Sequence, residues 1–141
     1  MLKKLNTRHA GFTLVEIMIV VAIIALLAAI AVPNFLRSRK RSQATQILED
    51  MRILQDGADQ YYIEHPAATG IGWEDIIQYV KTGSRLYNAQ TGTGGGAVCR
   101  DLLGNGFMNT GGGTSIQVVV NPATFNALSD VAPAEFWSPY R

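Results

Sequence analysis

The sequence has few of the residues from which catalytic and metal sites are usually built. Of its 141 residues one is a cysteine, Cys99, so no disulfide closes within the chain and no multi-cysteine zinc site forms. His9 and His65 are the two histidines. Charged residues make up 16% and the formal net charge is +1, so there is no bulk polycation to hold nucleic acid. We therefore expect no metal centre and no nucleic-acid partner.

The length excludes the larger enzyme folds. A chain of 141 residues forms one compact domain, or a small domain with an extension. It is too short for a TIM barrel or a two-domain dinucleotide enzyme. Hydrophobic residues make up 48%, so we do not expect the whole chain to be disordered.

One long hydrophobic run dominates the N-terminal third. The twenty residues Ile17–Leu36 carry no charge and would form a helix of about 30 Å, the thickness of a bilayer core. Lys3, Lys4 and Arg8 precede the run and favour keeping that end in the cytoplasm. The basic run at 37–41 follows it and argues mildly against that orientation. Positive charge alone therefore does not decide the topology.

Three interpretations of this segment are open. The first is a simple signal-anchor helix. The second is a secretory signal peptide that ends at Ala29-Ile30-Ala31, which fits an A-x-A cleavage site. Glu16 inside the apolar stretch and the helical pattern past Pro33 argue against a signal peptide. The third depends on the residues in front of the run.

These residues form a motif, Gly11-Phe12-Thr13-Leu14-Val15-Glu16. It resembles the start of type IV pilins and of the pseudopilins of type II secretion, and the resemblance covers about the first 40 residues. The resemblance implies that prepilin peptidase cuts between Gly11 and Phe12 and that the new amino group of Phe12 is methylated. The family's glutamate falls on Glu16 and its mid-helix proline on Pro33.

The same resemblance implies a function. The chain is expected to be a structural subunit, not an enzyme, that needs no cofactor and polymerises into a type IV pilus-like filament. It would begin as a single-pass inner-membrane protein with a cytoplasmic N-terminus and end in a periplasmic or extracellular filament. Its partners would be prepilin peptidase, the inner-membrane assembly platform and further copies of itself. The alternatives are a surface pilin for adhesion or motility and a membrane-anchored binding domain that never polymerises.

The implied fold is α+β and lollipop-shaped, with one long helix packed on a small antiparallel sheet with loops. Residues 1–11 would be a leader that is removed, and residues 12–36 a transmembrane and filament-core helix. Residues 37–65 would be the amphipathic continuation of that helix. Residues 66–141 would form a small globular head.

Glu16 and Pro33 carry the physical argument for assembly. A carboxylate near the bilayer interior is costly, so Glu16 needs a partner. Once the leader is gone, no basic residue lies within two helical turns of Glu16. The new amine at Phe12, on the same chain or on a neighbour, is the natural partner. Pro33 removes a backbone donor and is expected to kink or locally open the helix.

The amphipathic segment shows helical spacing. Its apolar residues recur at intervals of 4, 3, 4 and 3: Ile47, Met51, Leu54, Ala58 and Tyr61. The opposite, solvated face carries Glu49, Asp50, Arg52, Gln55, Asp56 and Asp59. Pro66 ends the helix. A second short helix over 73–80, with a glycine stop at Gly83, should bury Trp73 and Ile77 against the apolar stripe.

The remaining residues predict the elements of a small head. Ile116–Val120 is the best strand. Weaker strand candidates are 97–99 and 106–108. Asn121-Pro122 predicts the start of a short helix that runs through Leu128. The aromatic tail 136–140 is expected to pack back on the domain.

No catalytic constellation emerges. The glycine-rich stretch Gly92–Gly96 lacks the Lys-Ser/Thr of a phosphate loop, so a flexible loop is the simpler interpretation. Cys99 and His65 lack a third orienting group, so a buried thiol is preferred over a nucleophile. The basic run 37–41 is expected at lipid headgroups or against acids of adjacent subunits.

One motif bears on which machine uses the subunit. Asp101-Leu102-Leu103-Gly104-Asn105-Gly106-Phe107 resembles a motif of major pseudopilins, although Leu103 stands where tryptophan is usual and Gly106 where proline is usual. Calcium, which steadies this region in many pseudopilins, lacks obvious ligands, because Asp130 and Glu135 are too few. The disulfide-closed loop common in adhesive pilins cannot form with one cysteine. We therefore prefer a pseudopilus subunit to a surface pilin.

Overall fold

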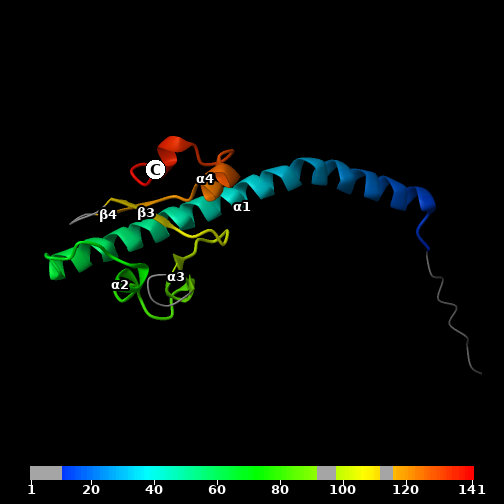
Figure 1. Cartoon of the computed structure of the whole chain (residues 1–141). Coiled ribbons are helices and arrows are strands. Elements are labelled where there is room, and N and C mark those ends of the chain that lie inside the picture. The colour runs from blue at the N-terminus through cyan, green and yellow to red at the C-terminus, as the bar shows by residue number, and fades with distance from the viewer. Residues whose placement is uncertain (1–10, 92–97, 112–115) are drawn as a thin grey trace, which may run out of the picture. The chain divides into compact units, whose positions relative to one another are not determined.

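The computed structural model of the chain describes residues 11–91, 98–111 and 116–141 (Figure 1). The chain divides into two units, residues 1–36 and residues 37–141. The described elements are one long helix, a few short helices and four short strands. The fold class is therefore α+β, as the sequence predicts.

The first unit is helical throughout its described length after Thr13. Helix α1 (Leu14–Glu64) begins here, and every residue from Gly11 to Leu36 is exposed. A helix satisfies its own backbone hydrogen bonds, which is what a hydrocarbon environment requires. By length and composition, α1 is a helix that could cross a membrane.

The later half of α1 belongs to the second unit and supplies the centre of its core. The stripe predicted from the spacing is buried, and one further residue extends it: Ala44, Ile47, Met51, Leu54 and Ala58. Tyr61, the last predicted member, is half-buried. The helix ends at Glu64, two residues before Pro66, because proline disfavours helical geometry in the residue before it.

Gly57 lies in the middle of α1 and is buried. A Cβ atom at this position would lie 3.0 Å from the Ile76 side chain and 3.3 Å from the Ile76 carbonyl oxygen. A glycine inside a helix ordinarily weakens it by about 1 kcal/mol. The structure explains the glycine, because the absence of a side chain at this position lets the helix that contains Ile76 (Trp73–Ile77) approach α1 closely.

Two short helices cover one side of this part of α1, and Figure 1 shows them there. Helix α2 (Trp73–Ile77) is shorter than the predicted 73–80, and helix α3 (Arg85–Asn88) was not predicted. Between them Gly83 has φ +79°, a left-handed conformation that favours glycine, but the prediction that it stops the helix is wrong, because α2 already ends at Ile77. Ser84 caps α3 by accepting a hydrogen bond from the Tyr87 amide.

Within the described residues, the predicted antiparallel sheet consists of two strand pairs. Strands β1 (Gln90–Thr91) and β2 (Val98–Cys99) form one pair, and β3 (Met108–Gly111) and β4 (Ile116–Val119) form the other. The predicted strand 116–120 is confirmed to within one residue. Of the weaker candidates, Ala97 lies outside the described residues, and the second strand begins at Met108 rather than Gly106.

The C-terminal part closes the core, as expected. Helix α4 (Pro122–Leu128) starts where the sequence predicts, with the Asn121 side chain accepting a hydrogen bond from the Ala123 amide. The 3-10 helix η2 (Ala134–Trp137) follows. Trp137 is fully buried, and its indole N–H donates to the Ala132 carbonyl oxygen at 3.1 Å.

The prediction that Trp73 is buried is wrong in degree. Trp73 is half-buried and packs against the margin of the core, whereas Ile77 is buried as expected. The fully buried tryptophan is Trp137, from the aromatic tail. An amphipathic pattern identifies the inward face of a short helix but not how far other segments cover it.

Candidate functional site

The start of α1 brings together the residues of the N-terminal motif. Thr13 stands immediately before the helix and Glu16 lies in its first turn. The Glu16 carboxylate accepts hydrogen bonds from the Thr13 amide at 2.8 Å and from the Thr13 hydroxyl at 2.7 Å. The Glu16 amide donates back to the Thr13 hydroxyl at 3.2 Å. This is a reciprocal capping box.

The capping box changes the account of Glu16. Sequence reasoning looked for a cationic partner and missed Thr13, although the pattern Thr-x-x-Glu before an apolar run is a known start signal for a helix. A carboxylate in the first turn also faces the positive end of the helix dipole. Glu16 therefore has a partner within its own chain. The pairing with a Phe12 amine stays a prediction.

The proposed cut lies in front of the helix. Gly11 and Phe12 are not helical, and the Phe12 side chain is 83% exposed. Nothing lies within 4 Å of a Cβ atom built on Gly11. The peptide bond between Gly11 and Phe12 is therefore neither inside the helix nor covered by another described segment. Lys3, Lys4 and Arg8 lie outside the described residues.

Pro33 lies inside α1, and the helix is unbroken on either side of it. The chain therefore accommodates the loss of one backbone donor without ending the helix. The local opening expected from the sequence is not seen in this structure. No glycine lies between Phe12 and Gly57 to loosen this stretch.

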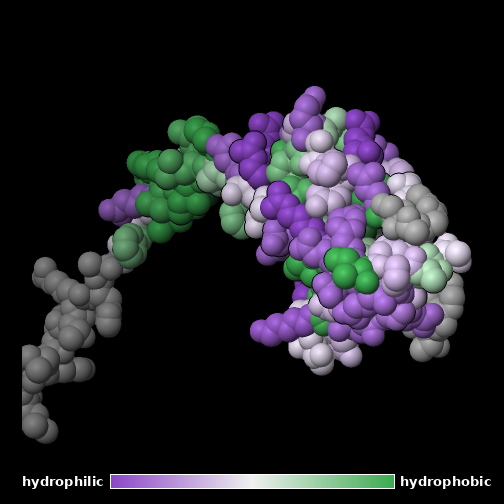
Figure 2. Space-filling view, turned by 90° about the vertical axis from the view of Figure 1, so that its left-hand side faces the viewer, coloured by the Kyte–Doolittle hydropathy of each residue, from purple (hydrophilic) through white to green (hydrophobic). Residues whose placement is uncertain are grey.

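The side chains around Pro33 form a large apolar surface. Every large hydrophobic residue from Phe12 to Leu36 is between 50% and 83% exposed. Figure 2 shows the helix here as one continuous hydrophobic surface. Soluble monomers rarely expose apolar patches of more than a few hundred Å², so this surface marks a membrane or protein contact.

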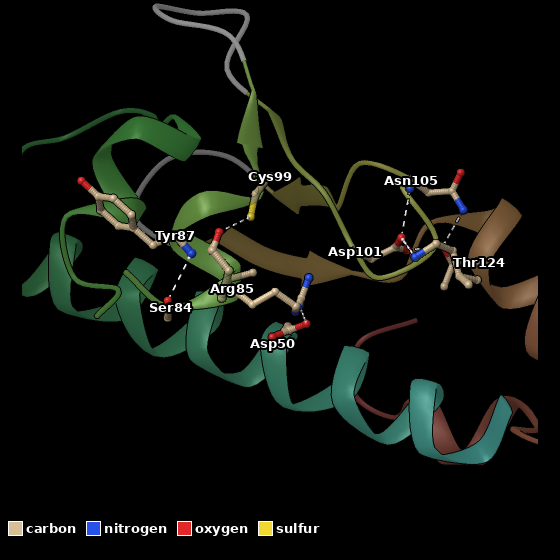
Figure 3. A network of polar contacts seen from close by, with 10 residues as sticks. Asp50, Ser84, Arg85, Tyr87, Cys99, Asp101, Asn105 and Thr124 are labelled. Atoms are coloured by element: carbon tan, nitrogen blue, oxygen red, sulfur yellow. Dashed lines mark hydrogen bonds and ion pairs between the residues drawn. The ribbon is translucent and has the colours of Figure 1, made fainter. Parts of the chain in front are cut away.

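The second unit contains an ion pair that the sequence did not predict. Asp50 was predicted on the solvated face of α1, yet it is 9% exposed and pairs with Arg85 of α3 (Figure 3). Gln55, from the same predicted face, bonds to strand β4. Its amide donates to the Ile116 carbonyl oxygen and accepts from the Val118 amide, both at 2.9 Å. Asp50 thus links α1 to helix α3, and Gln55 links α1 to strand β4.

The pseudopilin-like motif folds into a tight turn around Asp101, which is buried. One oxygen of its carboxylate accepts from the amides of Leu103 at 2.8 Å and Asn105 at 2.9 Å. The other accepts from the Thr124 hydroxyl of α4, which also receives the Asn105 side-chain amide at 3.0 Å (Figure 3). Gly104 has φ +84°, which explains glycine at that position. The motif thus ties its loop to α4.

Cys99 is buried in strand β2, as the sequence predicts. Its thiol lies 3.7 Å from the Leu86 carbonyl oxygen. Burial raises the pKa of the thiol to about 11. A thiol that stays protonated at neutral pH is a poor nucleophile, so Cys99 is a core residue.

A hydrogen bond joins the last residue of α1, Glu64, to Tyr79, which follows α2. The Tyr79 hydroxyl donates to the Glu64 carboxylate at 2.6 Å. This bond lowers the pKa of Glu64 and raises the pKa of Tyr79 to about 12. His65 stacks on Tyr61 at 4.4 Å and lies far along the chain from Cys99, with which it was considered as a pair.

Among residues 11–91, 98–111 and 116–141 no group of three His, Cys, Asp or Glu residues could hold a metal ion. Asp130, weighed as a calcium ligand, instead binds Lys40 of α1 at 3.0 Å. The glycine-rich stretch 92–96, weighed as a phosphate loop, lies outside the described residues.

These features define an α+β protein with a long N-terminal helix, apolar and exposed in its first half. Residues 6–32 match the family model of the prokaryotic N-terminal methylation motif. The resemblance to pilins and pseudopilins stated from the residues is therefore confirmed for the N-terminal segment.

Relatives come from both kinds of machine. The chain is 43% identical over 61 residues to the type IV major pilin protein PilA of Myxococcus xanthus, which covers 43% of this chain and 28% of that pilin. It is 32% identical over 73 residues to the type II secretion system core protein G of Escherichia coli, which covers 50% of each. It is 41% identical over 59 residues to the type IV wide pilus major component PilA4 of Thermus thermophilus, covering 42% and 45%.

The chain thus spans half or less of the length of these curated relatives. No solved structure matches it. The three relatives are named as pilin, pilus and secretion-system proteins, and none of them is named as an enzyme.

Proposed function

We propose that this chain is a filament subunit of the type IV pilin kind. Prepilin peptidase removes residues 1–11, the amino group of Phe12 is methylated, and copies of the processed chain polymerise through residues 12–36. The observation that carries the proposal is the match to the methylation motif over residues 6–32, which runs into the first half of α1, where every described residue up to Leu36 is exposed. Such a surface needs either lipid or other copies of the helix to cover it.

The membrane and the filament are successive environments in this proposal. The chain first sits in the inner membrane with a cytoplasmic N-terminus, held by residues 12–36, and the assembly platform then extracts it into the filament. Glu16 favours the second environment. In lipid its carboxylate has partners from its own chain only, among them Thr13, whereas in a filament the Phe12 amine of a neighbour supplies a further positive charge.

We further propose that the filament is a pseudopilus of type II secretion. Support comes from the turn around Asp101, which builds the pseudopilin-like motif into the head, and from the similarity to core protein G. A surface pilin is the second candidate, favoured by the similarity to the Myxococcus and Thermus pilins. Deleting the gene should abolish secretion of an exoprotein and leave surface pili, twitching and adhesion unchanged. Loss of pili with secretion intact would favour the second candidate.

The proposal is tested by the mass of the protein in the cell. We expect a mature chain that begins at Phe12 and carries one methyl group. Gly11→Leu should leave the leader attached and abolish filaments. Gly70→Leu is the matched control, because Gly70 is exposed and nothing lies within 4 Å of its Cβ position. A chain that keeps Met1 would be a simple anchor, and one that begins at Val32 would be a secreted protein.

A further inference from the structure

Three exposed arginines follow the apolar run of α1. Arg37, Arg39 and Arg41 are exposed, and in the part of the chain that the structure describes none of their side chains makes a hydrogen bond or ion pair. The intervening base, Lys40, is different. Its ammonium group binds Asp130 at 3.0 Å and so belongs to the fold of the head. We call the three arginines the basic collar.

The collar has the geometry of a site for a partner that surrounds the helix. Arg37 and Arg41 are one turn apart and share a side of α1, whereas Arg39 points to the opposite side. Lys40 faces the head between them. A single protein partner would contact one face of the helix. Lipid headgroups lie all around a helix at one depth, and the collar spans about 6 Å along the axis.

The position of the basic collar along α1 also fits lipid headgroups. Ile17–Leu36 carry no charge and span about 30 Å, so Arg37 reaches the water–lipid boundary as the hydrocarbon ends. Guanidinium groups bind phosphate oxygens in a two-pronged geometry. The collar stands on the side away from the cytoplasm, where basic residues are not needed for topology and even oppose it.

We propose that the basic collar binds the headgroups of anionic phospholipids in the outer leaflet of the inner membrane and holds the subunit there before assembly. This proposal rests on the membrane orientation given under the proposed function. Extraction into a filament would then require release of these headgroups as well as transfer of the apolar helix. Anionic lipid content would thus set how readily the subunit leaves the membrane.

The test measures lipid preference in vesicles that contain the full chain and no assembly machinery. The chain is reconstituted in phosphatidylcholine with a trace of spin-labelled phosphatidylglycerol or spin-labelled phosphatidylcholine, and the motionally restricted fraction of each label is compared. We expect phosphatidylglycerol to be preferred by about fivefold, the ratio equivalent to one basic side chain near an anionic surface. The triple variant R37Q/R39Q/R41Q should lose most of this preference.

Three controls separate the collar from other charges. R52Q removes an exposed arginine about three turns beyond Arg41 in α1 and should leave the preference unchanged. K3Q/K4Q/R8Q removes the leader charges and measures their share on the other leaflet. R37K/R39K/R41K keeps the charge and should keep most of the preference. Circular dichroism of each variant checks that the head is folded.

The outcomes are distinct. If the chain floats with the vesicles and is inserted, but the triple variant has the wild-type preference, the lipid site is overturned while the proposed function stands. If the triple variant instead loses cross-links between copies in pure phosphatidylcholine, the collar serves a second copy and the lipid proposal is wrong. A chain that does not insert contradicts both proposals.

Discussion

From Phe12 to Leu36 every large apolar side chain is at least half exposed, whereas residues 37–141 enclose a core in which Ile47, Met51 and Trp137 are fully buried. Both regions draw on the same helix, α1. In the second region the hydrophobic effect is satisfied inside the chain, at about 25 cal/mol per Å² of apolar surface removed from water. In the first region the same free energy is gained only when lipid or other copies of the chain cover the apolar side chains. One helix thus serves two environments, and the difference lies in what covers it.

The largest effect should come from the core of the second region. In a fragment of residues 37–141, Trp137→Ala should lower the free energy of unfolding by about 3–5 kcal/mol, because a fully buried indole is removed. Trp73→Ala should cost about 1 kcal/mol, because that ring is only half-buried. Urea unfolding followed by circular dichroism measures both. Equal losses would mean that the two rings are equally covered and would contradict the burial of Trp137 in preference to Trp73.

The next prediction concerns the first region. Glu16→Leu should leave insertion intact or improve it while lowering filament yield about tenfold or more. The wild-type carboxylate costs about 2–3 kcal/mol in the bilayer and so favours the filament over the membrane, and the leucine variant loses this preference. Glu16→Gln separates charge from capping, since glutamine also serves in a capping box. Quantitative blotting of membrane and filament fractions measures both. Wild-type yield in Glu16→Gln would assign the residue to helix capping and deny the charge a role in assembly.

A smaller effect is expected at the ion pair between α1 and α3. Arg85→Ala leaves the Asp50 carboxylate buried without its partner and should cost about 1–3 kcal/mol, below the value for a fully buried pair because the Arg85 side chain is 41% exposed. Arg52→Ala, which breaks the exposed pair with Glu49, should change stability by less than about 0.5 kcal/mol. Unfolding of both variants in urea makes the comparison. Indistinguishable losses would contradict the burial of Asp50.

The smallest effect is a pH dependence. The pKa of the Cys99 thiol is raised to about 11, so the folded state favours the protonated form. Its contribution to stability is complete below about pH 9 and is lost as the pH rises toward 11. The difference in unfolding free energy between wild type and Cys99→Ala should therefore shrink over that window. A difference that stays constant from pH 8 to 10.5 would show that the thiol is not desolvated.

Local signals in the sequence predict the candidate site and several elements of the head. The apolar run, the start of α4 at Asn121 and strand β4 depend on neighbouring residues, so spacing and turn chemistry are enough to find them. The capping box of Thr13 and Glu16 is equally local, and a search for the Thr-x-x-Glu pattern would have found it. The processing and assembly roles of Gly11, Phe12, Glu16 and Pro33 remain predictions.

Contacts between distant residues could not be predicted in this way. Asp50 and Arg85 are 35 residues apart, and an acid on a helix surface has the same local pattern whether or not a later segment covers it. The two separate sheets in place of one, and Trp137 in place of Trp73 as the buried ring, likewise depend on which segments meet.

The sequence by itself determined the apolar first half of α1, its single acid and the amphipathic second half, because these follow from composition and from a repeat of 3.6 residues. The tertiary structure alone decided that Gly57 admits Ile76, that Asp50 is covered by Arg85, and that the turn around Asp101 is tied to α4. The physical reason is that burial is a property of two surfaces in contact, and a local pattern describes only one of them.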